Sequence, residues 1–275
     1  MYATYSPDHN NAAMPTYAFV NQKGGTGKTT TTVSLAGALQ EQGQEVLLVD
    51  LDRQGNATTW LGQSEHESDL KNYLIEMPDD APFRQTEWEG LDVLAGGPPT
   101  ATAYTALRHH ALEGGKVVDR LKRLLQRDAS EYDFILIDCP PALDFDTNTA
   151  FAAADGAILV CSTTGMSVQG LAQTFFHLRD NVHGVDGVNP NLDVTGVLAT
   201  MYDRRLSVAK DTLEQLQTHQ ALGDLVFNTI IRQNTDIEKA WEAREPITSF
   251  KAHSRGAEDY SALADELVAA VAEPA

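Results

Sequence analysis

A glycine-rich stretch from residue 23 to residue 30 carries the residue types that bind phosphate. Glycines allow consecutive backbone N–H groups to turn toward an anion, and a helix that begins directly after them adds the positive end of its dipole. Lys28 can reach the β- and γ-phosphates of a nucleotide, and the Thr29 hydroxyl can bind Mg²⁺. The predicted nucleotide-binding residues are therefore Lys23, Gly24, Gly25, Thr26, Gly27, Lys28, Thr29 and Thr30.

The stretch matches the general pattern G-x-x-x-x-G-K-[ST] only in a deviant form. An additional lysine, Lys23, stands four residues before Gly27 and is the most informative residue of the chain. A glycine-rich turn without a ligand is the alternative interpretation. The short apolar run Tyr17–Val20 before the stretch and the helical pattern that begins near Lys28 favour the phosphate cradle, because strand, glycine loop and helix are the context that the motif requires.

Carboxylates follow two further apolar runs of strand length. The run Val46–Asp50 leads into Asp50 and Asp52, and the run Tyr132–Asp138 ends in Asp138. Such runs fit strands of a parallel sheet that is buried on both faces, and ligands bind outside the carboxyl ends of these strands. Apolar residues that run into an aspartate match a Walker B element, whose carboxylate holds Mg²⁺ directly or through water. The predicted metal-binding residues are Thr29, Asp50, Asp52 and Asp138.

Strand and helix patterns alternate along the chain, which predicts an α/β fold with a doubly wound, mostly parallel sheet flanked by helices. Residues 1–15 are polar and are predicted to be a flexible leader. Residues 60–90 are polar and acidic, which favours a surface excursion. Further strands are expected at 91–94, 155–161, 192–201 and 225–231, and helices from 28 to Gly43, at 103–127 with a possible break at 114–115, at 167–180, around 206–216 and at 254–271.

The composition is strongly acidic, with 39 Asp and Glu residues against 20 Lys and Arg residues and a formal net charge of −19. Adaptation to a salty cytoplasm and an ordinary acidic surface both fit this balance, and either should repel DNA and anionic membranes overall. The two cysteines, Cys139 and Cys161, fit a reducing cytosol. The chain lacks an apolar run of about 18 residues and a secretory signal, so we expect a cytoplasmic protein without a membrane partner.

Three segments together resemble the ParA/Soj branch of the deviant Walker A ATPases, the chromosome and plasmid partitioning family of the MinD/ParA superfamily. They are the glycine-rich stretch, the segment Val46–Thr58 and the residues Asp-Cys-Pro-Pro at 138–141, in that order. Matching segments run from about Tyr17 to Leu267, so the resemblance implies one ParA-like P-loop ATPase domain over residues 16–275. Arg53 stands where the family usually has proline, which removes a rigid φ angle from the switch segment.

The resemblance implies that ATP, with Mg²⁺, drives two subunits into a sandwich homodimer. Lys23 would then reach the nucleotide of the partner, where an ammonium group offsets the charge that develops on phosphate oxygens. Asp52 would orient the attacking water, and Asp50 would support the switch and the Mg²⁺ shell, although spacing alone does not separate these two roles. The catalytic residues that the resemblance implies are Lys23, Lys28 and Asp52.

The resemblance also implies DNA binding without sequence preference, association with the nucleoid, and a ParB-like or other adaptor that stimulates hydrolysis. Residues 204–255 hold eight basic and seven acidic side chains, whereas the rest of the chain holds 12 basic and 32 acidic ones. The excess of acidic side chains therefore lies outside residues 204–255, as a patch that contacts phosphates requires. Chance clustering of helix-surface residues is the alternative. The predicted DNA-binding residues are Arg204, Arg205, Arg232 and Lys251.

Other functions of the superfamily depend on features that can be read from the chain. The sequence does not separate an ATPase that partitions or positions DNA from one that positions a protein cargo along the nucleoid. A MinD-like spatial regulator would need a basic amphipathic tail, but residues 265–275 are acidic. An iron–sulfur reductase would need paired thiols, whereas Cys139 and Cys161 are expected to be buried and inert. An ATP-gated binding module with negligible turnover is the non-enzymatic alternative.

Overall fold

The computed structural model describes residues 14–66, 69–112, 117–164, 168–182 and 188–272, so nearly all of the predicted leader lies outside the described residues. These residues form a seven-stranded sheet in the order β3-β4-β2-β5-β1-β6-β7, which consists of β1 (Thr16–Val20), β2 (Val46–Asp50), β3 (Arg84–Gln85), β4 (Leu91–Leu94), β5 (Phe134–Asp138), β6 (Gly156–Ser162) and β7 (Asp193–Thr200). Only the pairing of β3 with β4 is antiparallel. The predicted doubly wound, mostly parallel sheet is thereby confirmed.

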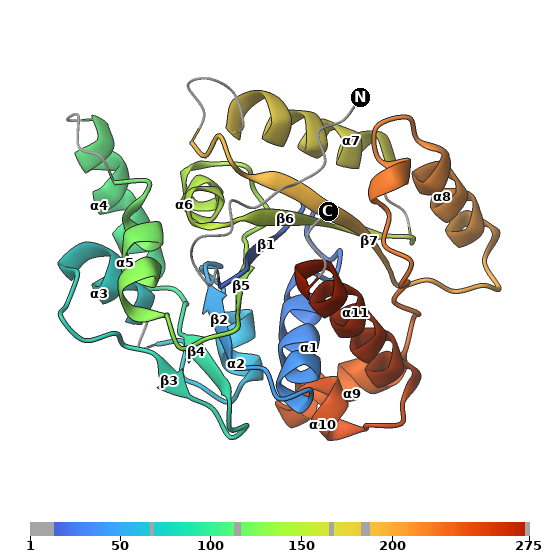
Figure 1. Cartoon of the computed structure of the whole chain (residues 1–275), viewed down its shortest axis with the longest axis horizontal. Coiled ribbons are helices and arrows are strands. Elements are labelled where there is room, and N and C mark those ends of the chain that lie inside the picture. Colours follow the sequence, from blue (N-terminus) through green and yellow to red (C-terminus); the bar gives the residue numbers. More distant parts are fainter. Residues whose placement is uncertain (1–13, 67–68, 113–116, 165–167, 183–187, 273–275) are drawn as a thin grey trace.

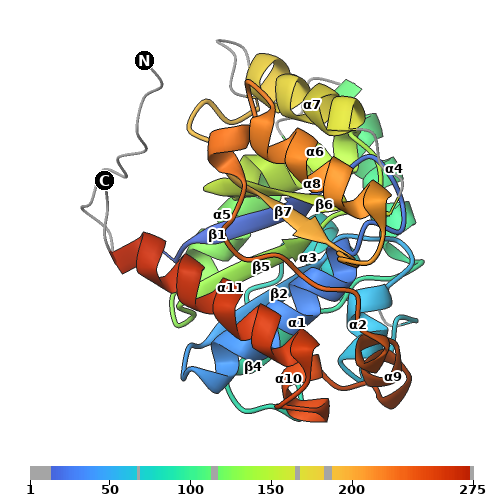
Figure 2. The same cartoon turned by 90° about the vertical axis from the view of Figure 1, so that its right-hand side faces the viewer.

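Helices cover both faces of the sheet (Figures 1 and 2). They are α1 (Lys28–Glu41), α2 (Asn56–Trp60), α3 (Asp69–Glu76), α4 (Thr100–Leu112), α5 (Arg120–Asp128), α6 (Phe145–Ala153), α7 (Val168–His177), α8 (Ser207–Thr218), α9 (Thr235–Ala243), α10 (Ile247–Phe250) and α11 (Arg255–Ala272). None of these helices, in the part of the chain that is described, is long and apolar enough to cross a membrane.

The strands are apolar throughout because both of their faces are covered. In β1, Ala18 and Val20 pack in one apolar core with residues of α3 to α8, while Tyr17 and Phe19 pack in a second core with α1, α2 and α9 to α11. This alternation follows from the two-residue period of a strand. The sheet is therefore held on both sides and forms a rigid support for the loops at its ends.

The strand register brings the candidate residues to one edge of the sheet. Asp50 at the end of β2 lies opposite Asp138 at the end of β5, and Phe19 of β1 lies opposite the same Asp138. The glycine-rich stretch begins shortly after β1. All three predicted segments thus leave the sheet at its carboxyl edge, which is where parallel α/β sheets bind ligands.

The predicted strand at 225–231 is wrong, since only isolated bridges, Val197 with Val226 and Tyr202 with Arg232, form there. The side chain of Glu266 on α11 accepts hydrogen bonds from the backbone N–H groups of Asn228 and Thr229, at 2.9 and 3.0 Å. A carboxylate thus takes donors that a continuous strand would offer to its neighbour, so the segment runs beside β7 without pairing along its length.

Two other expectations need correction. Within the predicted surface excursion at 60–90, α3 buries Leu70, Tyr73 and Leu74 in the core. Their spacing of three and four residues is the helical pattern that the polar composition of the segment concealed. The helix expected at 103–127 is two helices, α4 and α5, and the possible break at 114–115 lies between them in residues outside the described ranges.

Candidate nucleotide site and basic cleft

The glycine-rich stretch turns sharply before it enters α1. Gly25 and Gly27 have φ angles of 72° and 91°, a left-handed conformation that side chains disfavour. The carbonyl oxygen of Thr26 accepts a 2.8 Å hydrogen bond from the hydroxyl of Thr200 at the end of β7. The loop is thereby held against the sheet edge with the N-terminal end of α1 directly behind it, which is the geometry of a phosphate cradle.

Lys28 and Thr29 meet Asp138 at the base of this loop. The Thr29 hydroxyl donates a 2.7 Å hydrogen bond to Oδ2 of Asp138, while the buried Oδ1 has no hydrogen-bond partner within the described part of the chain. Burial and then the neighbouring Asp50 raise the pKa of Asp138 well above its ordinary value. Burial lowers the pKa of Lys28, and Asp138 opposes that shift. A free carboxylate oxygen beside a threonine hydroxyl fits a divalent cation.

The protein groups alone do not enclose a metal ion. Within the described ranges no cluster of three or more His, Cys, Asp or Glu residues is placed to hold one. Mg²⁺ at a phosphate site needs only one or two protein oxygens, because phosphates and waters complete its six ligands. Thr29 and Asp138 supply that kind of partial ligand set, so the predicted metal site fits a metal that arrives with a nucleotide.

Asp50 supports the loop that follows β2. Its Oδ2 accepts hydrogen bonds of 2.8 Å from both the backbone N–H and the hydroxyl of Thr58, and its Oδ1 accepts a 3.1 Å bond from the N–H of Asp52. Asp50 is completely buried, and this burial raises its pKa to about 6. Both of its oxygens are engaged in shaping the loop, which is what a supporting residue does.

Asp52 is less buried than Asp50, and its side chain accepts fewer hydrogen bonds. Its Oδ1 accepts a 3.0 Å hydrogen bond from the N–H of Gln54, which closes a local turn. Burial lowers the pKa of Lys28, and the charge of Asp52 opposes this shift, as that of Asp138 does more strongly. The structure therefore places a half-exposed carboxylate within the electrostatic reach of Lys28.

Lys23 begins the glycine-rich stretch and differs from Lys28 in exposure. Its backbone N–H donates a 2.9 Å hydrogen bond to Oδ1 of Asn21, and the residue is exposed. Lys28, only five positions later, is buried. The two lysines of the stretch thus lie in different environments.

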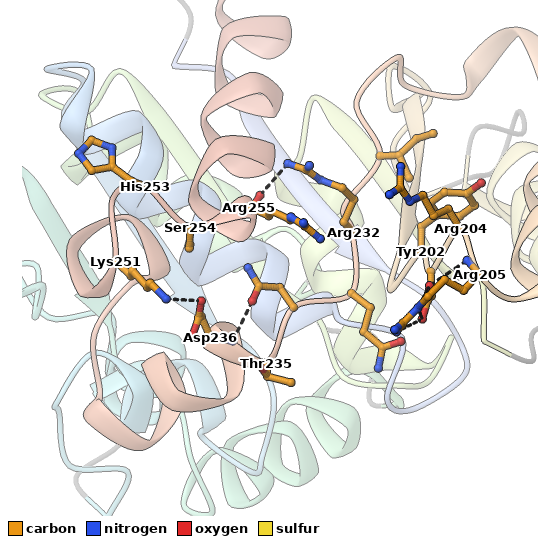
Figure 3. A pocket seen from close by; sticks show the side chains of 14 residues that line it. Tyr202, Arg204, Arg205, Arg232, Thr235, Asp236, Lys251, His253, Ser254 and Arg255 are labelled. Atoms are coloured by element: carbon orange, nitrogen blue, oxygen red, sulfur yellow. Dashed lines mark hydrogen bonds and ion pairs between the residues drawn. The ribbon is translucent and has the colours of Figure 1, made fainter.

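The four residues predicted to bind DNA line one open cleft with a volume of about 990 Å³ (Figure 3). Three of them are already paired with carboxylates in the described structure: Arg205 with Asp203 at 2.7 Å, Arg232 with Asp259 at 2.7 Å, and Lys251 with Asp236 at 2.8 Å. Arg204 and Arg255 make no ion pair within the described residues. The basic residues that line the cleft are Arg204, Arg205, Arg232, Lys251, His253 and Arg255.

Comparisons with known proteins agree with this geometry. A family model described as an AAA domain matches residues 14–194. The sporulation initiation inhibitor protein Soj of Bacillus subtilis is 35% identical over 257 residues, covering 92% of this chain and 97% of that protein. The chromosome partitioning protein ParA of Caulobacter vibrioides is 33% identical over 255 residues, covering 91% of this chain and 92% of that protein. The chain belongs to the ParA/MinD family of P-loop ATPases.

A solved structure extends the similarity to the whole fold. Cobyrinic acid a,c-diamide synthase from Mycobacterium smegmatis, with bound ATP analog and magnesium, is 30% identical and superimposes with a TM-score of 0.80. The superposition covers 95% of this chain and 97% of that one. The fold of this chain is therefore similar, over nearly its whole length, to that of a protein crystallised with an ATP analog and magnesium.

Neither cysteine of this ParA/MinD-family chain is exposed. Cys139 and Cys161 are both buried, and burial raises the pKa of each thiol. Buried thiols with raised pKa values are unreactive. The sequence-based expectation that both cysteines are buried is therefore confirmed, and their burial fits inert thiols.

Sequence reasoning missed the residues that hold the loops of the site in place. Thr58 binds Asp50, and the N–H of Gly96 donates a 3.0 Å hydrogen bond to the Thr58 hydroxyl. A Cβ atom on Gly96 would lie 2.1 Å from the carbonyl oxygen of Asp50, so only glycine fits there. The Gly96-Gly97 pair was a visible signal of a close backbone approach, but its partner could not be read from the sequence.

Proposed function

We propose that this chain binds and hydrolyses ATP, dimerises when ATP is bound, and binds DNA without sequence preference to partition or position plasmid or chromosomal DNA. One observation carries the proposal: a single segment, residues 200–205, bonds to the glycine loop at its first residue and lines the basic cleft with its last four. Thr200 donates its hydroxyl hydrogen bond to the glycine loop, and residues 202–205 line the cleft. A change in the loop on nucleotide binding therefore acts directly on the cleft.

ATP and Mg²⁺ are the cofactors that the loop fits best. Lys28 and the backbone of the glycine loop would bind the phosphates, while Thr29 and Asp138 would hold Mg²⁺, which neutralises phosphate charge during transfer. Asp52 would orient the attacking water, because it is half-exposed and lies within electrostatic reach of Lys28. The similarity to a mycobacterial protein with bound ATP analog and magnesium supports this assignment.

The exposed side chain of Lys23 supports a dimeric active state. A second ammonium group at the nucleotide would offset charge on the phosphate oxygens, and Lys23 is exposed whereas Lys28 of the same subunit is buried. We propose that Lys23 serves the nucleotide of a partner subunit. Hydrolysis would end the dimer, and a ParB-like adaptor would stimulate that step.

DNA binding at the cleft must compete with internal ion pairs. Phosphates would replace Asp203 and Asp236 as partners of Arg205 and Lys251, while Arg204 offers a cation without such a pair in the described structure. Since each phosphate contact releases counterions, binding should weaken steeply with salt. The protein would then associate with the nucleoid in the cytoplasm through many weak, exchangeable contacts.

The test is DNA binding by the full chain with ATP and with ADP over a salt series, measured by fluorescence anisotropy on duplexes of unrelated sequence. We expect ATP-dependent binding with similar affinity for each sequence and a logarithmic salt slope of several units. Arg204→Glu with Arg205→Glu should weaken binding by at least about tenfold at low salt while ATP-dependent dimerisation is retained.

A matched control reverses the same number of charges away from the cleft. Lys122→Glu with Arg123→Glu on α5 changes the net charge equally, so it should lower affinity only through the general field of the protein. If the two double variants bind DNA equally well, the cleft is not the DNA site. If the unaltered chain binds DNA equally with ADP and with ATP, the nucleotide does not control the cleft.

A further inference from the structure

Arg53 joins the loop after β2 to the N-terminal end of α6. Its Nη2 lies 3.0 Å from Oδ2 of Asp146 and 3.9 Å from Oδ2 of Asp144. The Asp146 side chain is completely buried, whereas that of Arg53 is 44% exposed. The ion pair thereby connects the exposed loop that carries Asp52 to the buried carboxylate of Asp146 on α6, which is remote in sequence.

The anchor for this contact is itself held firmly. Arg108 of α4 reaches the same two carboxylates, at 2.7 Å from Asp146 and 3.1 Å from Asp144. Asp144 also caps α6 by accepting a 3.1 Å hydrogen bond from the N–H of Asp146. A buried carboxylate is costly without partners, so the paired arginines and the cap keep Asp146 in one position.

The two arginines do not bind Asp146 in the same way. Arg108 donates a hydrogen bond to Oδ1, whereas Oδ2, which faces Arg53, accepts no hydrogen bond within the described residues. The contact of Arg53 is therefore an ion pair that depends on charge and distance more than on direction. A tether of this kind can hold a loop and still release it.

The loop itself offers mostly local bonds. The N–H groups of Asp52, Gln54 and Gly55 bond to Asp50 or Asp52, all within the same turn. These bonds shape the turn, while Arg53 adds a contact to an element that is remote in sequence. The arginine backbone is not fixed at one φ as that of a proline would be, so the contact with Asp146 restrains the loop where its local bonds do not.

We propose that Arg53 is a positioning residue for ATP hydrolysis, whose ion pair with Asp146 holds the loop so that Asp52 faces the nucleotide. The inference rests on the proposed function, since it assumes that Asp52 orients the attacking water. A displacement of about 1 Å at a catalytic group can cost about a hundredfold in rate. Removal of the Arg53 ion pair leaves the local hydrogen bonds of the turn intact, so it should lower the rate by less than about a hundredfold.

The experiment is steady-state ATP hydrolysis by the full chain, with kcat and KM measured separately. Arg53→Ala should lower kcat about tenfold and leave KM within about twofold, because the loop loses its position but the phosphate cradle is unchanged. Arg53→Lys should restore most of kcat, since an ion pair without directional bonding accepts an ammonium group. Arg53→Gln, which is uncharged, should not restore it.

Arg127→Ala on α5 is the matched control, because Arg127 is similarly exposed, at 40%, and pairs with a carboxylate, while its hydrogen bonds go to Asp128 and to the Pro78 carbonyl oxygen, away from the loop and from Asp146. It should lower the thermal stability slightly and keep kcat within about twofold. The proposal is overturned if Arg127→Ala lowers kcat as much as Arg53→Ala, if Arg53→Ala keeps full kcat, or if Arg53→Ala changes KM alone, which would mean direct nucleotide contact.

Asp52→Ala in the same assay separates this inference from the function on which it rests. An inactive Asp52→Ala with a fully active Arg53→Ala would reject the tether and keep the proposed catalytic role of Asp52. A fully active Asp52→Ala, or an unaltered chain without ATP hydrolysis, would reject the proposed function and this inference with it.

Discussion

Asp50, Asp52 and Asp138 lie at one edge of the sheet but differ in burial and hydrogen bonding. Asp50 uses both oxygens to shape a loop, Asp138 keeps one buried oxygen without a hydrogen-bond partner among the described residues, and Asp52 is half-exposed. Spacing in the sequence could not separate Asp50 from Asp52, because both follow the same strand. Their hydrogen bonds support a structural role for Asp50 and leave Asp52 free for chemistry.

Asp50 should make the stability of the nucleotide-free protein depend on pH. Its pKa of about 6 in the folded protein exceeds its ordinary 3.8, so the folded state binds the proton more tightly, and stability is lost as pH rises through this range. Between pH 5 and pH 7.5 the loss from this residue should be about 1 kcal/mol. Urea unfolding of the unaltered chain and of Asp50→Asn measures it, since the variant should lack this part of the slope. Equal slopes would contradict the burial argument.

Lys28→Ala should weaken ATP binding about a hundredfold or more, which corresponds to roughly 3 kcal/mol. The reason is the loss of a charge-assisted contact with phosphate in a site where water cannot replace it. Titration with a fluorescent ATP analogue measures the affinity, and Lys28→Met, which keeps the apolar stem, should behave alike. Lys122→Ala on α5 is the control for loss of a positive charge elsewhere. Unchanged affinity in Lys28→Ala would refute the cradle.

Among the helices, α11 determines how the segment after α8 lies against the sheet. Glu266 of this helix accepts bonds from the backbone of Asn228 and Thr229 and from the Asn228 side chain. The segment therefore lies beside β7 without becoming a strand, and it leads directly to Arg232 in the cleft. The carboxylate of Glu266 thus accepts the backbone donors between Phe227 and Ile231, the two positions at which the segment bonds to β7.

Glu266→Ala should reduce the free energy of unfolding by about 1 kcal/mol, since it leaves two backbone N–H groups without their acceptor. Amide hydrogen exchange at residues 228 and 229 should accelerate at the same time. Asp265→Ala on the same helix removes a bond to the Gln42 side chain at the surface, so it should change stability by less than about 0.5 kcal/mol. Equal effects of both substitutions would show that the Glu266 contact is not what holds the segment.

For the molecule as a whole, the distribution of charge explains how an acidic protein can be proposed to bind DNA. The net charge of −19 opposes DNA binding in general, but six basic side chains gather in one cleft, whose lining begins two residues after Thr200, which bonds to the glycine loop. Three of these side chains are held by carboxylates in the described structure. Binding is therefore expected to be weak, local and sensitive to salt.

Asp52→Ala should accumulate as an ATP-bound dimer, because the subunits can still close around ATP but the attacking water is no longer oriented. Sedimentation with ATP should show a lasting dimer, while phosphate release falls about a hundredfold. Lys23→Ala should remain a monomer with ATP if this lysine serves the nucleotide of the partner. A monomeric Asp52→Ala with ATP, or normal turnover by that variant, would contradict the proposed cycle.

The glycine-rich loop before a helix, the positions of most strands along the chain and the candidate carboxylates could be predicted from the sequence because each has a local or periodic signal. Glycines at fixed spacing before a helix mark the loop, and apolar runs that end in Asp50 and Asp138 mark buried parallel strands. These features depend on neighbours within about one strand and one helix. Family resemblance added the expected roles of Lys23 and Asp52, which no local pattern supplies.

Tertiary structure alone decided which of these residues meet, because contacts between distant segments leave no periodic signal. The pairing of Arg53 with Asp146 and of Glu266 with the backbone at residues 228 and 229 each joins elements far apart in the chain. The exposure of Lys23 and the burial of Lys28 within one loop likewise follow from the sheet edge behind it. The physical reason is that burial and charge pairing are properties of the packed molecule, whereas turns and strand patterns are properties of the chain.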